Sequence, residues 1–74
     1  MVTIKLNLTL IKLVGKKELE FSYKDSKILS VVLDEIGLSP DEIGMVIKND
    51  RWVSIDCLIE ENDVVQLFPH LEGG

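Results

Sequence analysis

Apolar and polar residues alternate at the start of the chain. Val2, Ile4, Leu6, Leu8 and Leu10 fall on one side of the alternation, and mainly polar residues lie between them. A period of two is typical of a β-strand with one buried face. We therefore predict a strand over residues 2–10 that ends within residues 11–14, followed by a turn at Gly15-Lys16-Lys17.

A second alternating segment follows this turn, and a helical period follows the second segment. Leu19, Phe21 and Tyr23 alternate with polar residues, which predicts a second strand antiparallel to the first. Leu29, Val32, Leu33 and Ile36 then recur at the spacing of one helix face, and Gly37 stands where a helix commonly ends. The pattern predicts one helix near residues 28–36.

The second half of the chain contains three more apolar segments. Residues 45–48 and 51–53 flank Asn49-Asp50 and predict a second hairpin, and residues 64–68 predict a final strand. Residues 39–42 are expected to form a loop with one helical turn, and residues 54–63 an acidic connector.

This element order predicts an α+β fold, with a mixed four- to five-stranded sheet crossed by one helix. We expect the first strand in the interior of the sheet, with the final strand beside it. The predicted core residues are Leu6, Leu8, Phe21, Leu33, Ile47 and Leu67.

Composition and charge limit the classes of partner. At 74 residues the chain has the size of one small domain, which buries about 60–65% of its unfolded surface. Residues 1–33 contain six lysines and three acidic residues, whereas residues 34–74 contain ten acidic residues, one lysine and one arginine. This distribution disfavours nucleic acid and favours a basic protein surface. We expect no membrane span and no secretory signal, and therefore a cytoplasmic protein.

The chain has few residues that carry chemistry. Cys57 is the single cysteine and His70 the single histidine, so we expect neither a disulfide nor a metal site. Asp56, Glu60 and Glu61 would raise the pKa of the Cys57 thiol, which favours a packing role over a reactive one. There is no glycine-rich nucleotide-binding loop, and we expect no cofactor.

The last five residues differ from the rest. The final apolar segment stops at Pro69, and the chain ends in Gly73-Gly74. Glycine tolerates nearly any backbone angle, so such an end can enter a narrow channel and present its carboxylate. A frayed terminus is the simpler interpretation of two glycines alone. We expect a domain over residues 1–69 and a flexible tail over residues 70–74.

The element order together with the Gly-Gly end resembles the ubiquitin-like β-grasp fold. It is similar, more narrowly, to the sulfur-carrier family that includes the small subunit of molybdopterin synthase and the thiamine sulfur carrier. The features that carry the resemblance are the hairpin at residues 46–51, the acidic turn at residues 60–63, the strand ending in Phe68-Pro69, and Gly73-Gly74. Asp50, His70 and Glu72 depart from the family pattern, and the Phe-Pro pair is closer to its molybdopterin branch.

The resemblance implies a carrier that is not itself an enzyme. A separate ubiquitin-activating-type enzyme would bind ATP and adenylate Gly74, and sulfur would then displace AMP to leave a thiocarboxylate. Leu71, Glu72 and Gly73 would be needed for this activation, and the large subunit of molybdopterin synthase, or another sulfur acceptor, would be the second partner. The candidate docking residues are Arg51, Trp52, Phe68 and Pro69, although half-buried strand packing is the simpler interpretation of Trp52.

Three other functions stay open from the sequence. One is a carrier of the thiamine type, and another is a protein modifier conjugated through Gly74. The third is an interaction module of the same fold in which the glycines have no role.

Overall fold

The fold is built on one five-stranded sheet. The computed structural model describes residues 1–70 of the chain. The strands lie in the order β2-β1-β7-β4-β5. Their bounds are Val2–Leu6 for β1, Glu18–Phe21 for β2, Ile43–Lys48 for β4, Arg51–Val53 for β5 and Val64–Pro69 for β7. The predicted mixed sheet is confirmed, because β1 pairs in parallel with β7 and the other neighbours are antiparallel.

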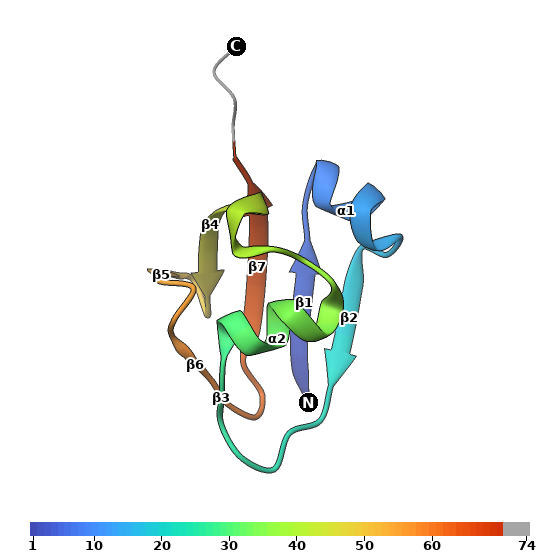
Figure 1. Ribbon diagram of the computed structural model, residues 1–74. Coiled ribbons are helices and arrows are strands. Elements are labelled where there is room, and N and C mark those ends of the chain that lie inside the picture. The colour runs from blue at the N-terminus through green and yellow to red at the C-terminus, as the bar shows by residue number, and fades with distance from the viewer. Residues whose placement is uncertain (71–74) are drawn as a thin grey trace.

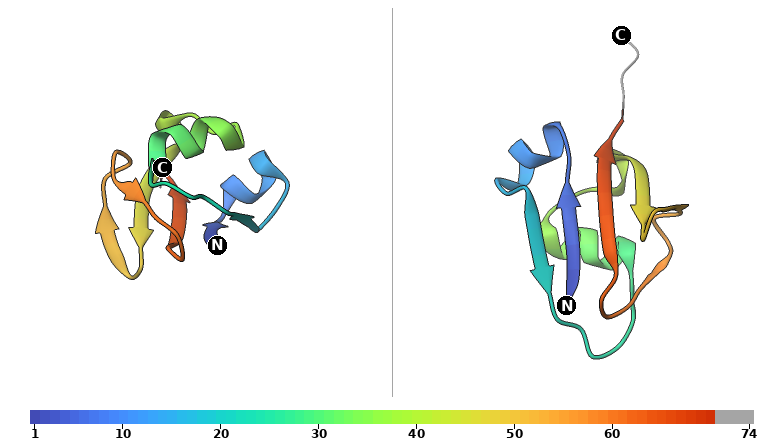
Figure 2. Two further views of the ribbon diagram at one scale, coloured as in Figure 1. Left: turned by 90° about the horizontal axis from the view of Figure 1, so that it is seen from below. Right: turned by 180° about the vertical axis from the view of Figure 1, so that it is seen from behind.

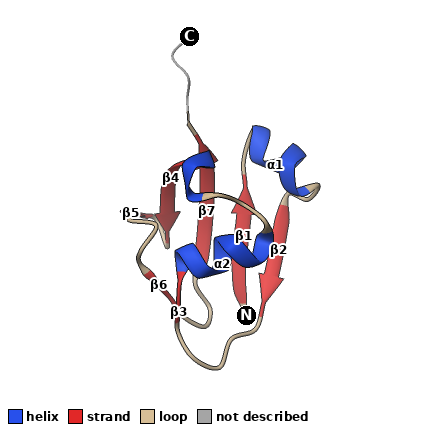
Figure 3. Ribbon diagram, viewed as in Figure 1, coloured by secondary structure: helices blue, strands red, loops and turns tan. Residues whose placement is uncertain are grey.

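Three helical segments and a small second sheet complete the fold (Figure 3). The helices are α1 (Thr9–Val14), α2 (Leu29–Ile36) and the 3₁₀ turn η1 (Pro40–Glu42). The short strands β3 (Lys27–Ile28) and β6 (Leu58–Ile59) pair with each other. The strand β6 lies within residues 54–63, which we predicted as an acidic connector without a strand. Within residues 1–70, no helix has the length and apolar character that a membrane span requires.

The hydrophobic core lies between the sheet and helix α2, which crosses one face (Figure 1). Leu29, Val32 and Leu33 of α2 are fully buried there. The strands contribute alternate residues, as a period of two requires: Val2, Ile4 and Leu6 from β1, and Val65 and Leu67 from β7. Helices α1 and α2 lie on the core side of the sheet. The view from behind in Figure 2 shows that the described chain leaves the opposite face of the sheet uncovered.

The predicted first strand is wrong beyond residue 6. The chain leaves the sheet at Asn7, and residues 9–14 form helix α1. Leu10 keeps its burial, because one helical turn carries it back over the core, with Ile11 and Val14 packed beside it. The spacing of Leu6, Leu10 and Val14 suits a helix as well as a strand, and Gly15 at φ 85° is a left-handed helix cap rather than part of a hairpin turn.

Three of the six predicted core residues are buried: Leu6, Leu33 and Leu67. Phe21 is partly buried at the edge of the core, where its ring stacks on that of Tyr23 at 5.8 Å. Leu8 and Ile47 were assigned wrongly to the core. Leu8 is 59% exposed because the chain has already left the sheet. Ile47 is half-buried on the uncovered face, because its neighbour Val46 occupies the core side of β4.

The predicted second hairpin forms between β4 and β5. Asn49 and Asp50 occupy its turn with φ of 51° and 68°. Two successive residues at positive φ are what a tight type I′ hairpin turn requires, and asparagine and aspartate tolerate these angles better than most residues. The turn therefore forms although neither of its two central residues is a glycine.

Candidate functional site

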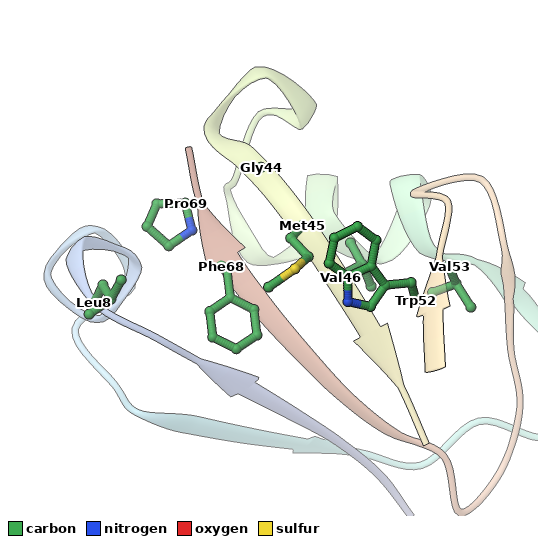
Figure 4. Close-up of a pocket in the computed structure, with 8 residues that line it drawn as sticks. All are labelled: Leu8, Gly44, Met45, Val46, Trp52, Val53, Phe68 and Pro69. Atoms are coloured by element: carbon green, nitrogen blue, oxygen red, sulfur yellow. The ribbon is translucent and has the colours of Figure 1, made fainter. Parts of the chain in front are cut away.

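An apolar groove lies on the uncovered side of the sheet, close to the point where the chain leaves β7 (Figure 4). Its volume is about 580 Å³. It is lined by Leu8, Gly44, Met45, Val46, Trp52, Val53, Phe68 and Pro69. These residues come from four separate parts of the chain, so only the folded sheet assembles them.

Strand register brings the large side chains of the groove together. Met45 on β4 lies opposite Phe68 on β7, and Trp52 on β5 lies opposite Ile47. Met45 and Ile47 are two positions apart on β4, so the side chains of Met45, Ile47, Phe68 and Trp52 share one face. The Trp52 side chain is 77% exposed. Half-buried packing, the simpler interpretation of Trp52, is therefore wrong.

The remaining part of the uncovered face is polar. Lys5 on β1 lies opposite Glu18 on β2, and Thr3 lies opposite Glu20. Lys5, Glu18 and Glu20 are exposed. Gln66 of β7 lies between Lys5 and Ile47 and continues this polar part, whereas Met45, Ile47, Trp52 and Phe68 form the apolar part of the face. A contiguous exposed apolar surface with a polar border is typical of an interaction site.

Leu8 is held in an unusual backbone conformation beside this groove. Its φ of 54° and ψ of −129° place it in a region that residues other than glycine rarely adopt. The side chain is nevertheless a large apolar one and is mostly exposed. This strained residue therefore contributes an exposed apolar side chain to the lining of the groove.

The chain leaves the sheet at the rim of the groove. Pro69 is the last residue of β7 and is still paired with Ile43 of β4. The next residue, His70, is exposed. Proline has no N–H to donate to a further strand pair, which suits a residue at the end of a strand. The tail therefore starts next to Phe68 and Gly44.

The candidate docking residues separate into two groups. Trp52, Phe68 and Pro69 lie together in the groove. Arg51 is exposed but does not line the groove, and it pairs with Lys48, which alternates with Ile47 along β4. The predicted tail residues Leu71, Glu72, Gly73 and Gly74 lie outside the described residues, as does the predicted flexibility of the tail beyond His70.

Cys57 does not have the environment of a reactive thiol. Burial raises the pKa of its thiol, Asp63 and Asp56 raise it further, and Lys48 has a lowering effect. The side chain packs against the edge of the core, which confirms the predicted packing role. Within residues 1–70, histidine, cysteine and acidic side chains form no group of three or more that is placed to hold a metal ion.

Sequence reasoning missed five residues of the groove: Leu8, Gly44, Met45, Val46 and Val53. Met45 carries the signal of alternation with buried Val46, which places it on the other face of β4. The signal for Leu8 was the helical spacing that follows it, since a strand that ends at residue 6 leaves residue 8 outside the sheet. Gly44 carries no sequence signal, because its importance depends on a neighbour in space.

No protein-family model matches the chain. No curated protein matches it either. Solved structures of other proteins share its fold. The Pyrococcus furiosus protein named "putative molybdopterin converting factor, subunit 1" is 22% identical, with a TM-score of 0.74 over 95% of this chain and 97% of that one.

Two proteins of Haloferax volcanii are similar to the same degree. SAMP1 is 20% identical, with a TM-score of 0.74 over 99% of this chain and 98% of that one. The HVO 2177 protein is 23% identical, with a TM-score of 0.77 over 99% of this chain and 85% of that one. The predicted ubiquitin-like β-grasp fold is thereby confirmed.

Proposed function

We propose that this protein is a sulfur carrier whose C-terminal Gly74 is adenylated by a partner enzyme and converted to a thiocarboxylate. The sulfur would be donated in molybdopterin biosynthesis, with the large subunit of a molybdopterin synthase as acceptor. The observation that carries the proposal is the position of the tail, which starts at Pro69 on the rim of an exposed apolar groove. The shared fold with a protein named for molybdopterin conversion supports the pathway.

In this proposal the groove binds the surface of the activating enzyme, and the tail brings the carboxylate to its active site. The activating enzyme would bury Trp52, Met45 and Phe68, whose exposed apolar surface resembles the centre of a protein interface. The five residues after Pro69 would then extend by roughly 17 Å into the enzyme. This reach allows the globular domain to stay outside while the carboxylate enters a buried pocket.

The chemistry would take place on the carboxylate of Gly74. One carboxylate oxygen attacks the α-phosphorus of ATP and pyrophosphate leaves, which gives an acyl-adenylate. Hydrosulfide, or another donor at the same oxidation level, then attacks the acyl carbon and AMP leaves, so no oxidant is required. The mixed anhydride is needed because the oxygen of a free carboxylate is a poor leaving group. The partner supplies the ATP site, and the proposed carrier is not an enzyme.

The test is intact-protein mass spectrometry. The chain ending at Gly74 is incubated with ATP, hydrosulfide and a ubiquitin-activating-type enzyme from the same organism. We expect a mass increase equal to the replacement of one oxygen by sulfur. A chain that lacks Gly74 should keep its fold and lose the change, because no described core residue lies beyond Pro69. Cys57→Ser should keep the change.

The same experiment separates the alternatives. An acyl-adenylate that acylates lysines of other proteins, with no thiocarboxylate formed, would indicate a protein modifier. Transfer to a thiamine precursor enzyme but not to a molybdopterin synthase would change the pathway and keep the carrier. An unchanged mass with every activating enzyme of the organism would contradict the proposal and leave an interaction module.

A further inference from the structure

Gly44 is a glycine that its own backbone conformation does not require. Gly15 and Gly37, at φ of 85° and 94°, have left-handed angles that favour glycine. Gly44 does not have a positive φ, so any residue could adopt its backbone angles. The reason for a glycine at this position of β4 must therefore come from what lies around it.

The atoms nearest to Gly44 belong to the backbone at the start of the tail. A Cβ atom placed on Gly44 would lie 2.7 Å from the carbonyl oxygen of Pro69, 2.8 Å from Cα of His70 and 2.9 Å from its nitrogen. All three are backbone atoms, so no change of side-chain rotamer would relieve the contact. The chain can follow this path out of the sheet only while residue 44 has no side chain.

The pairing of β4 with β7 is irregular at the same place. Ile43 lies opposite Pro69 and Met45 opposite Phe68, so Gly44 is an extra residue in the ladder. Extra residues of this kind bend a strand and redirect the chain next to it. Gly44 also lines the groove that contains Phe68 and Pro69 (Figure 4). One residue thus contacts both the groove and the start of the tail.

We propose that Gly44 is a positioning residue, which sets where the tail starts relative to the docking groove. This inference rests on the proposed function. When the groove is bound to the activating enzyme, every residue after Pro69 starts from the point that Gly44 defines. A methyl group at residue 44 would move that point while the groove side chains stay in place. The carboxylate would then reach the enzyme displaced from its reacting position.

The test compares Gly44→Ala with Gly15→Ala in adenylate formation, measured by ATP–pyrophosphate exchange with the organism's activating enzyme. A displacement of about 1 Å lowers turnover by up to about 100-fold in such reactions. We therefore expect Gly44→Ala to lower the kcat of the activating enzyme about 10- to 100-fold. The KM of that enzyme for this protein should change little. Gly15→Ala forces alanine to positive φ with no atom within 4 Å of the added Cβ. It should lower the melting temperature and keep kcat.

A structural measurement accompanies the kinetics. In the wild-type protein an NMR cross-peak is expected between Hα of Gly44 and Hα of His70, and Gly44→Ala should shift the His70 signals and leave those of Leu33 in place. If Gly44→Ala does not fold, a chain with one glycine inserted between Pro69 and His70 moves the tail without a change at residue 44. That insertion should lower kcat in the same way.

The outcomes separate this inference from the function on which it rests. Wild-type protein that gives no pyrophosphate exchange contradicts the proposed function. Exchange by the wild type together with an unchanged kcat for Gly44→Ala, or for the insertion where Gly44→Ala does not fold, contradicts the role of Gly44 alone. A loss that appears in KM and not in kcat also contradicts it, because Gly44 would then act in docking.

Discussion

Asn49 and Val64 hold each other through two hydrogen bonds across the sheet. The backbone N–H of Asn49 donates to the carbonyl oxygen of Val64 at 2.8 Å, and the N–H of Val64 donates to Oδ1 of Asn49 at 2.9 Å. Nδ2 of Asn49 also donates to Oδ1 of Asp63 at 2.8 Å. The turn of the β4–β5 hairpin is thereby joined to the start of β7, at the end of the strand opposite the tail.

Replacing Asn49 should separate the value of this contact from the value of the turn conformation. Asn49→Gly removes the side-chain bonds and keeps the positive φ, and we expect a loss of about 1–2 kcal/mol in the free energy of unfolding. Asn49→Ala should lose about 1 kcal/mol more, because alanine is strained at positive φ. Urea denaturation measures both. A glycine variant less stable than the alanine variant would contradict the assignment.

Leu33 tests the position of the core. Its side chain is fully buried between α2 and the sheet. Leu33→Ala should cost about 2–5 kcal/mol in the free energy of unfolding, since a cavity is left where the side chain was. Leu13 has the same side chain and is 61% exposed. Leu13→Ala should change the stability by less than about 0.5 kcal/mol. Similar losses in the two variants would place the core elsewhere.

Leu8 should show a conflict between stability and docking. Leu8→Gly relieves a strained backbone and should gain about 1 kcal/mol of stability, after the entropy loss of glycine is deducted. The same variant removes an apolar side chain from the groove and should raise the KM of adenylation. Leu8→Ala keeps the strain and should raise KM without the gain in melting temperature. A Leu8→Gly variant with lower stability than the wild type would contradict the strain.

Trp52 should carry much of the docking energy. The indole is mostly exposed in the free protein, so Trp52→Ala should alter the free energy of unfolding by less than about 0.5 kcal/mol. Loss of a central aromatic contact weakens binding by roughly 2 kcal/mol, and we expect KM to rise at least about 10-fold. Arg51→Ala is the matched control, because Arg51 is adjacent but lies outside the groove. An equal effect of both variants would point to non-specific loss.

Acid should weaken the contact between α2 and the segment before it. Oε1 of Glu35 accepts a hydrogen bond from Nζ of Lys27 at 2.9 Å, and this bond lowers the pKa of the Glu35 carboxyl. Because the pKa of Glu35 in the folded protein lies below the unfolded pKa of 4.5, the bond stabilises the protein at pH values above 4.5. This stabilisation is lost as the pH falls through the folded-state pKa.

Glu35→Gln should therefore lose less stability than the wild type when thermal melts are repeated below pH 4.5. Asp34→Asn removes the neighbouring carboxylate, which forms no ion pair within residues 1–70. That variant should keep the acid dependence of the wild type. If the melting temperatures of Glu35→Gln and of the wild type fall equally with pH, the Lys27–Glu35 pair does not contribute to the acid dependence.

Local periodicity was sufficient for much of the fold. The helical spacing of Leu29, Val32, Leu33 and Ile36 predicted α2, because one face of a helix must be apolar to pack on a sheet. Alternation predicted where β1 begins, and the strongly apolar character of this strand predicted its interior position with β7 beside it. Phe68 and Pro69 were identified as site candidates through the resemblance to the sulfur-carrier family, and the missing N–H of proline indicated that the strand stops at Pro69.

The remaining features depended on contacts between distant parts of the chain. Leu6, Leu8 and Leu10 look alike in an alternating pattern, and only the packing of α1 decided that Leu10 is buried and Leu8 exposed. Trp52 is exposed because β5 is the edge strand and no described element covers that face. Gly44 has ordinary backbone angles, so its role follows entirely from the approach of Pro69 and His70. Periodicity in the sequence predicts which side of a helix or strand is apolar. Which other element packs against that side is decided by the tertiary structure of the whole chain.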